Sequence, residues 1–385
     1  MNFVQKSGIS FLLKSFVAWR IGLFAILLLA TRFLPHGNNF LGGGMTSYLS
    51  NPYLWSWANF DGEHYLSIAQ WGYKNLQYFF FPVYPVLTGR IGLLFTGNFV
   101  LSGLLISNVA FFLGLMGLWK LITLDFDKKI AKLAVILLLI FPTSFYFGSV
   151  YTEGLFFALA VWSLFWARKG NFLFAAILSG FASATRVIGI VLLPVLVAEY
   201  FLQQKGFKLK WNFLYILLAP AGILIYMYYL GVRVNDPLEF LHTISIFGPQ
   251  RSDSLILLPQ VFYRQVFYRY FFKVMPNLDY TNFLAFYPSV LELIVALAFT
   301  VLSVYSLFKL RLSYSLYLAL GFLASSLSGS FSSLPRYVLV LFPAFLLSAV
   351  WIQGLPATVR FFIYGLLFVG LTISASMFLR GYWIS

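Results

Sequence analysis

Long apolar runs recur along the chain and constrain its fold more than any other feature. The runs from Phe99 to Leu121 and from Tyr287 to Phe308 are long enough to cross a hydrocarbon core of about 30 Å as helices. Hydrophobic residues make up 61% of the 385 residues and charged residues 10%, a balance far from that of soluble domains. Because no alternating strand pattern competes, the sequence predicts an all-α polytopic membrane protein.

The apolar runs predict about eleven membrane crossings. The expected helices cover residues 11–34, 99–122, 131–149, 153–167, 171–184, 187–203, 212–230, 286–308, 312–330, 336–352 and 358–378. The two short helices that meet near Arg186 suggest a re-entrant hairpin. No soluble domain or internal repeat is recognisable, so residues 1–385 are predicted to form a single transmembrane domain with two long connections, 35–98 and 231–285.

The distribution of charge predicts the orientation of these helices. Arg20 interrupts the first apolar run and no small-residue cleavage site follows it, so we expect a retained helix and not a secretory signal. With a cytoplasmic amino terminus, the inner connections collect most lysines and arginines, as cytoplasmic loops do, and both long connections lie outside with most of the acids. We therefore expect an integral, multi-pass protein of a prokaryotic plasma membrane or of the endoplasmic reticulum, with its site extracytoplasmic or lumenal.

Composition argues against several kinds of chemistry. The chain has no cysteine and three histidines, so neither thiolate nor multi-histidine metal centres are expected. The formal charge of +15 is spread among apolar segments, which fits anionic lipid headgroups better than nucleic acid. The absence of a glycine-rich phosphate loop disfavours a nucleotide-fuelled pump. We expect no obligatory cofactor or metal, although Asp61 and Glu63 offer oxygen ligands for a divalent ion.

The stretch NFDGEHYLSIAQWGY at 59–73 is the strongest candidate for a functional site, because two carboxylates and a histidine stand out in an apolar chain. In a helix, Asp61, His64 and Tyr65 share one face and Glu63 points elsewhere. A carboxylate at a membrane boundary can accept the proton of an attacking hydroxyl. A solvated loop with ordinary charges is an equally good explanation of this motif taken alone.

Two segments are predicted at the membrane interface. The run FFFPVYPVL at 79–87 contains prolines that discourage a regular crossing. Residues 255–273 interleave apolar side chains with Arg264, Arg269 and Lys273, as expected of an interfacial helix that contacts lipid.

Three more charged residues fall at the predicted outer face. Glu153 stands where a helix begins, so it either interacts with the helix dipole or serves a site. Arg186 and Arg336 run against the positive-inside bias. A guanidinium binds phosphate through paired hydrogen bonds, or it reaches the lipid phosphates at the membrane surface. The two arginines together with the acidic cluster favour a site.

These motifs together resemble the PIG-V-like mannosyltransferases, which are multi-pass members of the GT-C glycosyltransferase superfamily. The aspartate motif and the Tyr-Thr-Glu segment are the most specific pieces, and the resemblance covers the first half of the chain well and the carboxy-terminal third thinly. The matching stretches are FDGEHYLSIAQWGY (60–73), FFPVYPVL (80–87), SNVAFFLGLMGLWKL (107–121), PTSFYFGSVYTEGLFF (142–157), ATRVIGIVLLP (184–194) and LPRYVLVLFPAF (334–345).

The resemblance implies a GT-C-like bundle and an inverting glycosyltransferase. Such an enzyme moves a sugar, here expected to be mannose, from a polyprenyl-phosphate or dolichyl-phosphate carrier to a lipid-linked or protein acceptor. It implies Asp61 as the general base. The residues implied in substrate binding are Glu63, His64, Tyr65, Tyr84, Tyr151, Glu153, Arg186 and Arg336.

The chain departs from the family pattern at Phe60, where tryptophan is common, and at Asn59, where a basic residue is common. A Gln-x-x-Trp element expected in the second long connection is matched poorly. The donor sugar and the acceptor therefore stay open, and so does the participation of an accessory membrane subunit.

Two rival functions use the same residues. A transporter or lipid flippase would use Asp61, Glu153 and Arg186 as a proton or anion path. No inverted repeat is visible, and the polar residues gather at one face and not at the midplane, both of which oppose transport. A non-catalytic subunit of a membrane complex would tolerate replacement of Asp61.

Overall fold

The computed structural model describes residues 3–204, 209–243, 252, 255–267, 283–327 and 329–384, and all regular secondary structure in these ranges is helical. The predicted all-α class is confirmed. The longer helices are α1 (Phe3–Phe33), α6 (Phe99–Ile122), α7 (Lys128–Leu139), α8 (Glu153–Arg168), α9 (Phe172–Ser183), α10 (Leu192–Gln204), α11 (Ala221–Val234), α14 (Phe283–Lys309), α15 (Leu312–Ser326), α17 (Phe342–Gln353) and α18 (Ala357–Leu379).

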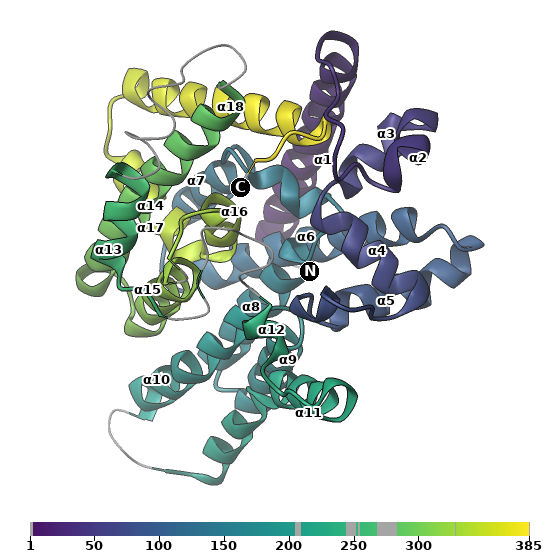
Figure 1. Ribbon diagram of the computed structural model, residues 1–385. Helices are drawn as coiled ribbons and strands as arrows, with labels where there is room; N and C mark the ends of the chain where they lie inside the picture. Colours follow the sequence, from purple (N-terminus) through teal and green to yellow (C-terminus); the bar gives the residue numbers. More distant parts are fainter. Residues whose placement is uncertain are drawn as a thin grey trace.

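Helices α6 and α8 lie in the middle of the molecule, as Figure 1 shows. The helices of the first 95 residues lie to one side, those after residue 255 to the other, and α9 to α11 form the lower end of this view. Gly154 lets the start of α8 approach α6 closely, since a Cβ there would lie 2.6 Å from the carbonyl oxygen of Ser107. This packing fixes the position of the neighbouring Glu153.

Five helices in the described ranges are long and apolar enough to cross a membrane, or up to seven if each of two bent pairs counts as one span. The multi-pass prediction is therefore confirmed, whereas the count of eleven crossings is not. The expected helix at 131–149 ends at Leu139 instead. Pro142 lacks an amide hydrogen, and the chain continues as a short 3-10 helix, η4 (Ser144–Gly148).

The first long connection folds into a chain of short helices. They are α2 (Gly44–Ser50), α3 (Pro52–Trp55), η1 (Ser56–Ala58), α4 (Asp61–Trp71), η2 (Gln77–Phe79), α5 (Val83–Gly92) and η3 (Leu93–Phe95). Pro82 precedes α5 and Pro85 lies in its first turn, where a missing amide hydrogen costs no helical bond. The prolines were expected to discourage a regular membrane crossing. In the structure they lie at the start of the short helix α5.

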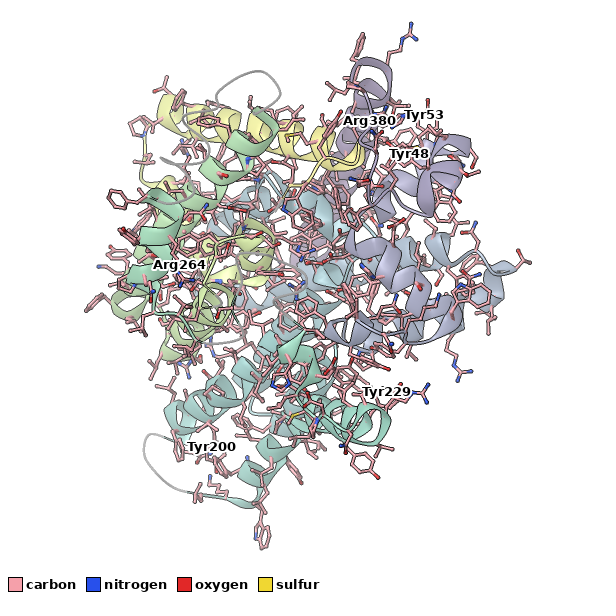
Figure 2. The ribbon with its side chains drawn as sticks, viewed as in Figure 1. Tyr48, Tyr53, Tyr200, Tyr229, Arg264 and Arg380 are labelled. Carbon is pink, nitrogen blue, oxygen red and sulfur yellow. The ribbon has the colours of Figure 1, made fainter. Side chains whose placement is uncertain are left out.

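The second long connection is described in part. It contains α12 (Glu239–His242) and α13 (Leu258–Tyr263). Just after α13, Arg264, which Figure 2 labels, is half-buried, and Gln265 donates a hydrogen bond to Glu292 Oε2 of α14 at 3.0 Å. This part of the expected interfacial helix therefore packs one face against the bundle. Arg269 and Lys273 lie outside the described residues.

Hydrogen bonds join the end of α18 to the start of the first long connection. Arg380 donates to the carbonyl oxygen of Leu34 at 2.9 Å and to Tyr48 Oη at 3.0 Å, and Figure 2 shows Arg380 and Tyr48 together beside α1. Tyr48 in turn donates to the carbonyl oxygen of Leu379 at 2.8 Å. Residues more than 300 positions apart thus form one structural unit.

An ionic network around the fully buried Glu199, called here the Arg168 cluster, joins α8, α10 and α15. Its members are Asp125, Arg168, Glu199, Gln203, Arg311, Ser313 and Tyr314. The fully buried Glu199 accepts hydrogen bonds from Arg311 at 2.7 and 2.9 Å, from Ser313 at 2.7 Å and from Gln203 at 2.7 Å. Arg168 forms a two-point ion pair with Asp125. Every charge in the cluster has a partner.

Candidate active site

Asp61 is positioned by the two residues that precede it. Asn59 is fully buried, accepts a hydrogen bond from the amide of Gly42 at 2.8 Å and donates one to the carbonyl oxygen of Phe378 at 2.8 Å. Phe60 adopts φ 58° and ψ −117°, a strained conformation for a bulky residue. The turn at Asn59 and Phe60 places Asp61 at the first position of α4. A carboxylate at this position interacts favourably with the helix dipole.

The Tyr-Thr-Glu segment docks directly on this turn. The amide of Val150 donates to the carbonyl oxygen of Trp57 at 2.9 Å, and Tyr151 Oη donates to the carbonyl oxygen of Asn59 at 2.9 Å. Glu153 then begins α8 and is 1% exposed. The two motifs that the sequence singles out are therefore parts of one site.

Two arginines reach the same place from distant elements. Arg186 is an extended residue between α9 and η5 (Val187–Val191). Arg336 belongs to α16 (Leu334–Tyr337), a short helix that continues as η11 (Val338–Val340) and is preceded by Ser333 at φ 66°. Short helices that meet at a bend let a polar side chain point inward at the end of an apolar segment.

The four charged side chains form a compact cluster, called here the Asp61 quartet. Arg336 Nη1 donates to Asp61 Oδ2 at 2.5 Å, and Arg186 Nη1 forms an ion pair with Glu153 Oε1. Arg336 Nε lies 3.6 Å from Glu153 Oε1, so this carboxylate faces both guanidinium groups. Two positive and two negative charges balance, which is the arrangement that buried charges require.

The ring of Tyr337 lies against both arginines, 5.2 Å from Arg186 and 5.0 Å from Arg336, and its hydroxyl accepts a hydrogen bond from Arg336 at 3.2 Å. Cation–π contacts of this kind hold guanidinium groups in place. Two more rings, of Tyr146 and Tyr151, lie 5.5 and 5.4 Å from the guanidinium of Arg336. Aromatic rings thus surround the buried positive charge.

The quartet lines a cavity of about 130 Å³. Aromatic side chains form part of its wall: Phe79 and Phe81 before α5, and Phe240 of α12. The polar lining consists of Asp61, Tyr65, Thr152, Glu153, Thr185, Arg186, Ser325, Arg336 and Tyr337. The cavity therefore combines anion-binding groups, two carboxylates and apolar walls, as a site for a sugar phosphate requires.

The structure brings five of the predicted residues to this cavity: Asp61, Tyr65, Glu153, Arg186 and Arg336. Tyr65 Oη lies 3.5 Å from Thr152 Oγ1. Burial raises the pKa of Tyr65, so its phenol stays protonated and can donate a hydrogen bond.

Four predicted substrate-binding residues do not line the cavity. Tyr84 and Tyr151 are buried beneath it, where Tyr84 donates to the carbonyl oxygen of Gly103 at 3.0 Å and Tyr151 holds Asn59. Glu63 accepts a hydrogen bond from the amide of Gly44 at 3.1 Å. His64 stacks on Phe80 with ring centroids 4.7 Å apart. Roles for these four residues in substrate binding stay predictions.

The surroundings of Glu63 and His64 shift their ionisation. Burial raises the pKa of Glu63, and the hydrogen bond from Gly44 opposes this effect. Burial lowers the pKa of His64, and the charge of Asp61 opposes it. A neutral His64 at pH 7 fits its stacking on an apolar ring.

Several residues of the site were not predicted from the sequence. Thr152 accepts a hydrogen bond from Arg186 at 3.2 Å, and Thr185, Ser325 and Tyr337 add hydroxyl groups to the lining. Thr152, Thr185 and Tyr337 each adjoin a charged residue that was predicted, which is the only sequence signal for them.

A separate group of possible metal ligands lies in the second long connection. Asp236, Glu239 and His242 each bring one ligand atom to within 4.8 Å of the others. His242 Nδ1 lies 2.6 Å from Asp236 Oδ2, and this hydrogen bond is the largest cause of a lowered pKa of Asp236. None of these three residues lines the cavity.

Residues 40–209 match the model of a protein family described as mannosyltransferase (PIG-V). The match confirms the resemblance predicted from the sequence for this part of the chain, and it supports the expectation of a glycosyltransferase. It includes Asp61, Glu153 and Arg186, whereas Arg336 lies beyond it. No curated protein matches the chain significantly.

Solved structures with similar folds include ArnT from Cupriavidus metallidurans bound to undecaprenyl phosphate, with 15% identity and a TM-score of 0.49 over 92% of this chain and 63% of that chain. The Archaeoglobus fulgidus oligosaccharyltransferase in complex with Zn and sulfate has 15% identity and a TM-score of 0.46 over 94% of this chain and 53% of that one. The chain therefore spans less than two thirds of the length of these proteins.

Proposed function

We propose that the protein is an inverting glycosyltransferase that takes a sugar, with mannose expected, from a polyprenyl-phosphate or dolichyl-phosphate donor. The acceptor is a hydroxyl of a lipid-linked or protein substrate at the extracytoplasmic face. The observation that carries this proposal is the Asp61 quartet, in which two buried arginines and two carboxylates share one cavity at the junction of two sequence motifs. The family match over residues 40–209 supports the same class of reaction.

The donor phosphate is assigned to the two arginines. A guanidinium offers a planar set of donors that suits phosphate oxygens. Arg186 and Arg336 both line the cavity, and their side chains are 14% and 5% exposed. In so enclosed a site, a fixed positive charge stabilises the charge that develops on the departing phosphate more strongly than it would in water.

Asp61 is assigned the role of general base. The acceptor oxygen attacks the anomeric carbon and forms the new glycosidic bond, while the bond from that carbon to the phosphate oxygen breaks. The hydroxyl proton passes to the carboxylate of Asp61, and the polyprenyl phosphate leaves with the bonding electron pair. Attack opposite the leaving group inverts the anomeric configuration.

Donor binding and base function are coupled through Arg336. In the free protein this guanidinium holds Asp61 Oδ2. The phosphate of the donor competes for the same positive charge, so donor binding weakens the hold on Asp61 and frees its carboxylate to accept a proton. The acceptor hydroxyl is thereby activated only when a donor is in place.

The test is transfer from a synthetic short-chain polyprenyl-phosphate mannose to a panel of lipid and peptide acceptors, with the wild-type protein and Asp61→Asn. Transfer by the wild type that is lost in the variant supports both the reaction and the base. Binding of the donor without turnover by the wild type contradicts the proposal and favours the transporter or the subunit. Retained turnover in the variant removes Asp61 from the base role.

A further inference from the structure

Two buried polar atoms of the Asp61 quartet have no hydrogen-bond partner among the residues that the structure describes. They are Arg336 Nε and Glu153 Oε2. Both side chains line the cavity, at 5% and 1% exposed. A buried charged group without a partner costs more than an ordinary hydrogen bond gains, so such atoms call for an explanation.

The other polar atoms of these side chains are engaged. Arg336 uses Nη1 for Asp61 and Nη2 for the hydroxyl of Tyr337, and Glu153 uses Oε1 for Arg186. Arg336 Nε lies 3.6 Å from Glu153 Oε1, beyond hydrogen-bond length. One charged donor and one charged acceptor therefore remain unused on two neighbouring side chains that line one cavity.

A ligand that satisfies both atoms carries an anionic oxygen close to a hydroxyl group. In a glycosyl phosphate, the phosphate is attached to the anomeric carbon and the nearest hydroxyl of the sugar is on the adjacent carbon, C2. The phosphate oxygen accepts from Arg336 Nε, and the 2-hydroxyl donates to Glu153 Oε2. The two free atoms thus match the two groups that flank the bond to be broken.

We infer that Glu153 makes the enzyme specific for donors with a free 2-hydroxyl, an inference that rests on the proposed function. A site built to receive a hydroxyl strongly rejects an analogue that lacks it, because a buried polar group is then left without a partner. Hydrogen bonds to the 2-hydroxyl also strengthen as positive charge develops at the anomeric carbon, as in glycoside hydrolysis. The preference is therefore expected in kcat/KM and not in binding alone.

The experiment measures kcat/KM for two donors, short-chain polyprenyl-phosphate mannose and its 2-deoxy analogue, with the wild type, Glu153→Gln and Glu199→Gln. The wild type is expected to prefer the mannose donor by about tenfold to a hundredfold, the range of one hydrogen bond to a charged group. Glu153→Gln offers only a neutral amide, so the preference is expected to fall by about fivefold to tenfold.

The ratio for the two donors is measured within one protein, so a smaller folded fraction of a variant does not change it. Glu199→Gln is the matched control, because Glu199 is a buried glutamate that accepts from Arg311 and does not line the cavity; it is expected to keep the wild-type ratio.

Equal use of both donors by the wild type would overturn the inference and leave glycosyl transfer standing. An unchanged preference in Glu153→Gln would overturn the role of Glu153. Transfer from neither donor by the wild type would overturn the proposed function and this inference with it.

Discussion

Helix α8 carries a cluster of charged side chains at each end, and the two clusters differ in how many of their polar atoms have hydrogen-bond partners. Glu153 begins the helix and Arg168 ends it, about 22 Å apart at 1.5 Å per residue. In the Arg168 cluster, Glu199 accepts several hydrogen bonds and Asp125 is held at two points. In the Asp61 quartet, Arg336 Nε and Glu153 Oε2 have no hydrogen-bond partner within the described part of the chain, and both side chains line a cavity.

This difference distinguishes charged groups that stabilise the fold from charged groups that are available to bind a ligand. Charged groups whose donors and acceptors all have partners add rigidity, and they have no free donor or acceptor for a substrate. Unsatisfied buried charges cost stability, and a protein keeps them where another molecule completes the set. The same residue types, arginine and carboxylate, therefore serve opposite purposes at the two ends of one helix.

The largest expected effect comes from exchanging aspartate for asparagine at each end. Asp61→Asn is expected to lower the transfer rate by about 10²- to 10⁴-fold, the range of general-base catalysis, and to change the thermal midpoint little because asparagine still accepts from Arg336. Asp125→Asn is expected to lower the midpoint and keep turnover per folded molecule, because both oxygens of Asp125 accept from Arg168 and asparagine keeps only one of them. Transfer assays and thermal unfolding in detergent check both, and the reverse pattern would break the comparison.

Removal of Glu199 tests the Arg168 cluster alone. Glu199→Ala removes the carboxylate that Arg311 contacts. Because the side chain of Arg311 is 31% exposed, the cost is expected to lie below the value of about 3 to 5 kcal/mol for a fully buried pair. We expect a large drop in thermal midpoint and an unchanged donor KM in the fraction that stays folded. A raised donor KM would mean that the two ends of α8 are coupled.

Truncation of one arginine at each end gives a smaller effect. Arg336→Ala is expected to raise the KM for the donor by about tenfold to a hundredfold, because a charge-assisted hydrogen bond to phosphate is lost, and to change the KM for the acceptor less. Arg311→Ala is expected to lower the thermal midpoint without that selectivity. An equal rise in the KM for the donor and in the KM for the acceptor in Arg336→Ala would point to misfolding.

The smallest effect is a response to acid at the Asp61 end. The lowered pKa of His64 means that the unfolded chain binds this proton more readily than the folded one. The stabilisation is present above the ordinary value of 6.5 and is lost as pH falls through the lowered pKa. His64→Gln is therefore expected to lose less stability than the wild type between about pH 6.5 and 5.

Thermal midpoints measured at several pH values check this expectation. Glu63 acts in the opposite sense, since its raised pKa favours the folded state at low pH. It is present in both proteins, so its contribution cancels in their difference. If the thermal midpoint depended on pH in the same way in the wild type and in His64→Gln, protonation of His64 would not be coupled to folding.

Much of the fold was predictable from apolar periodicity alone. The expected helix at 99–122 has the bounds of α6, and the helix expected to begin at residue 153 is α8. Pro142 was a visible signal that the helix expected at 131–149 would stop early, but its effect was underestimated. Length and hydropathy determine where a helix lies in the chain, and they say little about how many helices span the membrane.

The site was predictable only as a set of residue types. Asp61 and Arg336 are 275 positions apart, so their pairing depends on how the whole bundle packs. The direction of a side chain also depends on packing: the hydroxyls of Tyr84 and Tyr151 donate to backbone carbonyls, which no sequence pattern indicates, and their predicted contacts with substrate stay predictions. Asn59 was noted only as a departure from a family pattern, although it anchors the turn before Asp61.

The anchoring of Asn59 to Phe378 has a consequence for biosynthesis. The hydrogen bond joins residues 319 positions apart, and Tyr146 Oη also donates to the carbonyl oxygen of Ile384 at 2.5 Å. The turn before Asp61 is therefore incomplete until α18 has been translated, more than 300 residues after Asp61 itself. A chain that ends between Arg336 and Phe378 holds every member of the quartet, and we expect it to be inactive because this hydrogen bond is missing.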